Sequence, residues 1–108
     1  MYTIEELRTK AQEASLYCDL LNEEILHAQN MWGRNPKTRP WKRRMEAQMM
    51  HVERIGEQIE RLLHLLADNS PPDHQVPEDV WDIQKHCATT LNGCAVVVRE
   101  IHDRLKRS

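Results

Sequence analysis

The sequence predicts an all-α protein, an up-down-up antiparallel three-helix bundle with long, coiled-coil-like helices. Apolar residues recur with helical period in three stretches, and segments rich in Pro, Gly, Asn and Asp separate these stretches. A chain of 108 residues has the size of one domain. We therefore expect a single helical-bundle domain over residues 1–108, with helices at about 4–31, 41–67 and 78–106.

The first helix carries the most regular periodic pattern. Thr3 and Glu6 have the spacing of a capping box, which marks a helix start. Small and apolar residues then follow in alternating steps of three and four: Ile4, Leu7, Ala11, Ala14, Cys18, Leu21, Ile25, Ala28 and Trp32. This is an unbroken heptad seam, and it predicts near-antiparallel packing of neighbouring helices at a shallow angle.

The second helix is a long amphipathic stretch over residues 45–66. Its apolar stripe consists of Met45, Met49, Val52, Ile55, Ile59, Leu62, Leu63 and Leu66. The opposite face holds the charged residues Glu46, Glu53, Arg54, Glu57, Glu60 and Arg61. Pro40 suits a first helical position, and residues 68–73 break the helix at its far end.

The third helix follows Pro77, with acidic residues in its first turn. Its inward stripe consists of Val80, Ile83, Cys87, Leu91, Cys94, Val97, Val98, Ile101 and Leu105. Asn92 and Gly93 form a turn signal within the stripe. Because the stripe keeps its phase across them, we interpret the segment as one helix, and a helix–turn–helix break is the alternative.

Alternating helix direction separates the charges of a chain whose formal net charge is only −2. The first connection, the start of the second helix and the end of the third helix meet at one end of the bundle. This end gathers basic residues with no acid between Arg34 and Arg44, and the last ten residues add Arg99, Arg104, Lys106 and Arg107. The other end gathers Asp68, Asp73, Glu78, Asp79 and Asp82.

The basic end is the candidate partner-binding site. Cations in the first turn of a helix oppose its dipole, so either Glu23 and Glu24 or an acidic partner should offset them. Arg together with Trp is typical of interface anchors. The alternative is that the two Trp rings close the bundle and the charges form a solvated rim. The candidate residues are Trp32, Arg34, Lys37, Arg39, Trp41, Lys42, Arg43 and Arg44.

Apolar residues outside the three stripes are candidates for self-association. Leu16, Tyr17 and Leu20 form one group on the first helix, and Trp81, Ala88 and Ala95 repeat every seven residues on the third. Heptad-spaced apolar residues suggest a second packing face. We therefore expect a homodimer, formed either through such a face or with the acidic end of one rod near the basic end of another.

The sequence carries no pattern that points to catalysis. The three cysteines lie on inward stripes, where a free thiol behaves as a small apolar residue. The six histidines have no spacing that would make a metal site, and there is neither a phosphate-binding loop nor a nucleophile motif. We expect no enzyme activity, no metal and no cofactor. The charged N-terminus and the lack of a long apolar run predict a cytoplasmic protein with no membrane partner.

These patterns favour a non-enzymatic protein-interaction module, a small regulatory adaptor or antagonist that binds a protein partner as a homodimer. The alternative is a nucleic-acid-binding protein that uses residues 34–44 and the C-terminus. A third option is a subunit that folds fully only with its partner.

Overall fold

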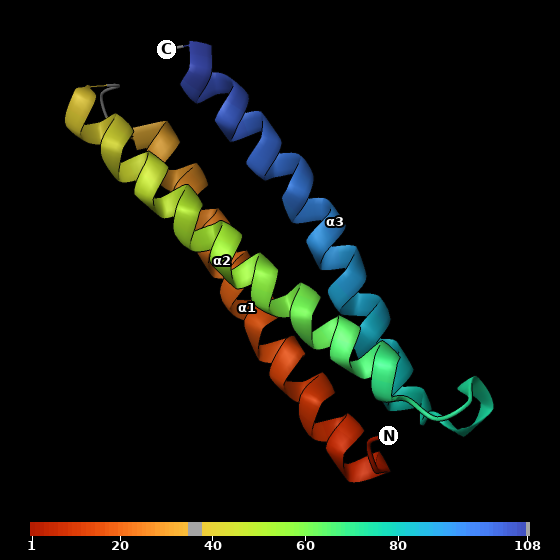
Figure 1. Ribbon diagram of the computed structural model, residues 1–108. Helices are drawn as coiled ribbons and strands as arrows, with labels where there is room; N and C mark the ends of the chain where they lie inside the picture. Colours follow the sequence, from red (N-terminus) through yellow and green to blue (C-terminus); the bar gives the residue numbers. More distant parts are fainter. Residues whose placement is uncertain (35–37, 108) are drawn as a thin grey trace.

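The computed structural model describes residues 1–34 and 38–107, with the side chains of residues 1–32 and 38–107. The chain forms α1 (Ile4–Arg34), α2 (Arg39–Asn69), a short 3-10 helix (Asp73–Gln75) and α3 (Glu78–Arg107). The predicted all-α three-helix bundle is confirmed. The helices form a rod of 53 × 18 × 17 Å, and Figure 1 shows the two chain termini at opposite ends of it.

Contacts at the two ends of the rod establish the helix directions. At one end, the Tyr2 N–H donates to the Asn69 carbonyl at 2.8 Å, and Arg8 of α1 pairs with Asp79 at the start of α3. At the other end, the Arg104 guanidinium near the end of α3 lies 5.7 Å from the centroid of the Trp32 ring near the end of α1. Successive helices therefore run in alternating directions, as the sequence predicts.

The helix starts follow from local hydrogen bonds. The Thr3 N–H donates to the Glu6 carboxylate at 3.3 Å and the Glu6 N–H donates to the Thr3 hydroxyl at 3.1 Å, so the capping box is present. In α2, the Thr38 hydroxyl accepts from the Trp41 N–H at 3.3 Å. This N-cap makes α2 begin at Arg39, before the predicted start at residue 41. Pro40 costs nothing there, because N–H groups of the first turn lack an intrahelical partner.

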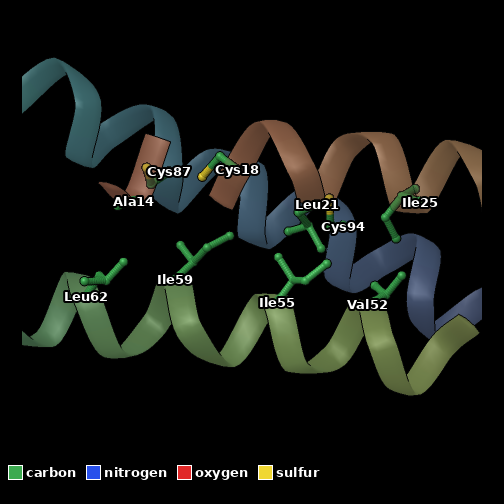
Figure 2. Packing of buried hydrophobic residues seen from close by; sticks show 10 residues of the cluster. All are labelled: Ala14, Cys18, Leu21, Ile25, Val52, Ile55, Ile59, Leu62, Cys87 and Cys94. Carbon is green, nitrogen blue, oxygen red and sulfur yellow. The ribbon is translucent and has the colours of Figure 1, made fainter. Parts of the chain in front are cut away.

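The buried residues form three clusters along the rod. The central cluster, shown in Figure 2, draws on all three helices and consists of Ala14, Cys18, Leu21, Ile25, Val52, Ile55, Ile59, Leu62, Cys87 and Cys94. The seam of α1 is buried from Leu7 to Ala28, whereas Ile4 is half exposed because it lies in the first turn. Helix α3 continues through Asn92 and Gly93, which confirms the single-helix interpretation.

Helix α1 is the common packing partner of the other two helices. It contacts both α2 and α3 along its seam, whereas α2 and α3 make far fewer contacts with each other. In Figure 1, α3 crosses behind α2 near the 3-10 helix and diverges from it toward the C-terminus. The bundle is therefore closed on the α1 side and less tightly packed between α2 and α3.

We predict that Trp41→Ala lowers the free energy of unfolding by about 3–5 kcal/mol, because it removes a large side chain from a tightly packed site. Trp41 is 1% exposed, and its ring N–H donates to the Met31 carbonyl at 3.0 Å. Trp81→Ala is the matched control, since Trp81 is 37% exposed at the other end of the rod. Chemical denaturation followed by circular dichroism measures both, and equal losses would contradict the prediction.

Candidate functional site

The basic end brings together side chains from the start of α2 and the end of α3. A hydrophobic cluster that joins Trp41 and Met45 to Ile101 and Leu105 holds the two helix ends together. The cations that surround this cluster are Arg39, Lys42, Arg43, Arg44, Arg104, Lys106 and Arg107, and of these only Lys42 is partly buried. Of the predicted site residues, Lys37 and the side chain of Arg34 lie outside the described part of the chain.

The two tryptophans of the predicted site support the basic end from within. The Trp41 ring is buried in the core and meets the half-buried Trp32 ring edge to face, with centroids 5.0 Å apart. The Arg104 guanidinium lies over the Trp32 ring. The buried Trp41 ring therefore cannot touch a partner and acts only by supporting its neighbours, whereas the arginine side chains are exposed to solvent.

Three arginines in the first two turns of α2 have no acidic partner among the described residues. Arg39, Arg43 and Arg44 form no ion pair with a carboxylate of residues 1–34 and 38–107. Glu24, one of the residues expected to offset them, instead accepts a hydrogen bond from the Gln48 side-chain amide at 2.6 Å. Of the three, only Arg39 lies in the first turn, where its unfavourable interaction with the helix dipole, about a few tenths of a kcal/mol, is not relieved by a carboxylate.

The opposite end of the rod is acidic. Asp79 in the first turn of α3 pairs with Arg8 of α1 at 3.0 Å, and this hydrogen bond holds the pKa of Asp79 below its ordinary value. Asp73, Glu78 and Asp82 are exposed nearby. The rod thus has one basic and one acidic end.

A groove between α2 and α3 is a second candidate site, which we call the α2/α3 groove. It has a volume of about 550 Å³ and opens to solvent along one side of the rod. Leu21 of α1 contributes to its floor. The groove is lined by Leu21, Val52, Glu53, Gly56, Glu57, Glu60, Leu63, Ala88, Leu91, Asn92, Cys94, Ala95, Val98 and Arg99.

The α2/α3 groove stays open because its walls carry small residues. Larger side chains at these positions of α2 and α3 would fill the space between the two helices. Gly56 of α2 has no side chain, and Ala88 and Ala95 of α3 carry only a methyl group. The α2 rim is acidic, whereas Arg99 is the only basic residue that lines the groove. An apolar groove with a charged rim is the kind of surface into which an amphipathic helix packs.

Sequence reasoning missed the groove but identified part of its wall. Ala88 was predicted to take part in self-association, and the structure places it in the groove together with Ala95. Glu53, Glu57 and Glu60 were assigned to the outer face of the second helix, and they form the rim. The available signal was the coincidence of Gly56 with heptad-spaced alanines on the next helix.

The other predicted self-association residues lie on separate surfaces. Leu16 is 69% exposed and Leu20 is also exposed, both on the outer side of α1. Tyr17 is partly buried and packs against the central cluster. Trp81 is partly exposed near the acidic end, where its ring N–H donates to the Asp73 carbonyl at 3.4 Å. No single patch therefore unites these residues.

The thiols are placed where they react poorly. Cys18, Cys87 and Cys94 are buried and unpaired, and burial raises the pKa of all three thiols. Cys18 of α1 and Cys87 of α3 are neighbours in the central cluster (Figure 2). Among the described residues, no three His, Cys, Asp or Glu side chains converge as metal ligands.

Within residues 1–34 and 38–107, no helix combines the length and apolar character needed to cross a bilayer. Comparison of the chain with protein-family models, with curated proteins and with solved structures gives no match.

Proposed function

We propose that this protein is a non-enzymatic protein-interaction module that acts by binding a partner protein, in the manner of a small adaptor or antagonist. The observation that carries the proposal is the α2/α3 groove, an apolar surface between two helices that pack poorly against each other. The groove offers a helix of another protein a preformed place beside the bundle. Its walls are two long helices that both pack against α1, so the groove is formed before a partner binds.

The residues of the groove support recognition rather than chemistry. Leu91 and Val98 are partly exposed in its walls and Ala88 and Ala95 are exposed, so a partner that covers them would remove apolar surface from water. The one thiol that lines the groove, Cys94, is buried and has a raised pKa. A module of this kind blocks a surface of its partner, as an antagonist does, or holds the partner close to another molecule, as an adaptor does.

We predict that Ala95→Trp, which places a large side chain in the groove, abolishes binding of the natural partner. Val96→Trp is the matched control, because Val96 is 56% exposed and does not line the groove. The wild type and both variants are used as bait in extracts of the native host, and captured proteins are quantified by mass spectrometry. Circular dichroism verifies that the helices persist. Capture of the same proteins in equal amounts by all three baits would refute the proposal.

A second candidate function, nucleic-acid binding, is favoured by the basic end. Arg39, Arg43 and Arg44 near the start of α2 form no ion pair with a carboxylate of the described residues, and a helix N-terminus attracts phosphate. The acidic residues along α2 confine such contact to the end of the rod.

For this alternative, Arg43→Glu with Arg44→Glu should abolish binding to random duplex and single-stranded oligonucleotides, measured by fluorescence anisotropy at low salt. Binding by the wild type should fall steeply as salt increases. Arg54→Glu with Arg61→Glu makes the same charge change in exposed residues of α2 away from the basic end, and it should retain most of the affinity. Absence of binding by the wild type at low salt would remove this function.

The homodimer expected from heptad-spaced apolar residues stays a prediction, with the outer face of α1 as the proposed contact. Leu16→Glu with Leu20→Glu should shift the chain toward monomer, because it places charge on both exposed leucines. Sedimentation velocity at high micromolar concentration measures the masses of both proteins. A wild type that is monomeric throughout the concentration series would exclude the dimer.

A further inference from the structure

We propose that the α2/α3 groove binds a cationic amphipathic helix of another protein, which lies lengthwise in the groove as a fourth helix of the bundle. This inference rests on the proposed function and adds the chemistry of the partner. The helix presents an apolar stripe to the floor of the groove and Lys or Arg residues to the α2 rim. The argument combines the charges of the rim, the small residues of the walls and the exclusion of a second copy.

The α2 rim carries a row of like charges that the chain itself leaves largely unmatched. Glu53, Glu57 and Glu60 are spaced so that they follow one side of α2 for about 10 Å. Glu53 lies 2.7 Å from the His102 ring nitrogen of α3. Glu57 and Glu60 form no ion pair within the described residues. Cations on a bound helix would pair with this row.

Gly56 has no role in the packing of this chain that requires a glycine. A Cβ atom built there would lie 3.9 Å from a methyl carbon of Leu91, which is ordinary van der Waals contact. Glycine disfavours a helix interior, so its presence in the middle of α2 calls for another reason. A glycine in one wall, facing Ala88 and Ala95 in the other, lets the backbone of a bound helix approach closely.

A second copy of this chain is a poor occupant. The apolar stripes of α1, α2 and α3 are already buried in the core of the bundle. The exposed pair Leu16 and Leu20 on α1 has acidic neighbours at Glu13, Asp19 and Glu23, which would face the acidic rim. Pairing groove to groove would bring the rim glutamates of both copies into one interface. The cations at the basic end of a second copy lie on helix ends whose apolar residues are packed in its own core, so they do not flank a free apolar stripe. A different protein with a cationic amphipathic helix therefore fits the groove better.

The test uses two fluorescein-labelled designed peptides of about five helical turns. Both have the same Leu and Ala face, one with Lys and the other with Glu on its flanks. Fluorescence anisotropy at physiological salt measures their affinity for the full chain. We expect the Lys peptide to bind about tenfold more tightly than the Glu peptide, from two or three charge pairs.

Two variants locate the binding. Glu57→Lys with Glu60→Lys should reverse the preference between the peptides, and Ala95→Trp should abolish binding of the Lys peptide. Glu13→Lys with Glu23→Lys, an equal charge change on the outer side of α1, should leave the preference intact. Glu23, Glu57 and Glu60 are exposed and the Glu13 side chain is 45% exposed, so the test does not depend on the folding of Ala95→Trp.

The inference is overturned if the two peptides bind equally, if neither binds, or if the α1 charge variant changes the preference as much as the rim variant. It is also overturned if sedimentation shows a dimer that Ala95→Trp dissociates, because a second copy then occupies the groove. In each case the broader function is judged separately by partner capture. If the peptide test fails but Ala95→Trp still loses the captured partner, the protein is an interaction module whose ligand is not a cationic helix.

Discussion

Packing against the narrow seam of α1 is the constraint on which the rest of the structure depends. Ala11, Ala14, Cys18 and Ala28 are fully buried there and are small enough to bring both neighbouring helices close to α1. Because each neighbour is drawn to α1, α2 and α3 contact each other much less. The α2/α3 groove is thus a consequence of how the core is built, and small residues in its walls keep it open.

The alternating helix directions determine which charged residues meet at each end of the rod. Arg43 near the start of α2 and Arg104 near the end of α3 are far apart in sequence, yet the cluster around Trp41 places them at one end. At the other end, Asp79 pairs with Arg8. A chain of small net charge thereby presents distinct surfaces: a basic end, an acidic end and an acidic rim beside the groove.

Periodicity predicts which side of a helix is buried but not how far apart two helices lie. It therefore predicted the three helices, their directions and the burial of Cys18, Cys87 and Cys94. It could not predict the groove, because the positions of Gly56 and Ala88 in the sequence fit a groove wall and an ordinary solvent-exposed helix face equally well. The start of α2 was missed for a local reason: the Thr38 cap adds helix before Trp41. The basic end followed from topology alone, whereas the burial of the Trp41 ring required the structure.

The groove and the core share residues, so binding in the proposed groove site would be coupled to folding. Leu21, Val52 and Cys94 belong to the central cluster and also line the α2/α3 groove. These side chains are already buried, and a helix that fills the groove would cover the partly exposed Leu91 and Val98 beside them. It would also add contacts to α2 and α3, the helix pair with the fewest contacts in the bundle. Any ligand that binds only the folded chain raises its stability, by about 2.7 kcal/mol at a hundred times the dissociation constant. A partner helix in the groove would therefore stabilise the helix pair that has the fewest contacts, and the stability of the bundle would respond to its binding.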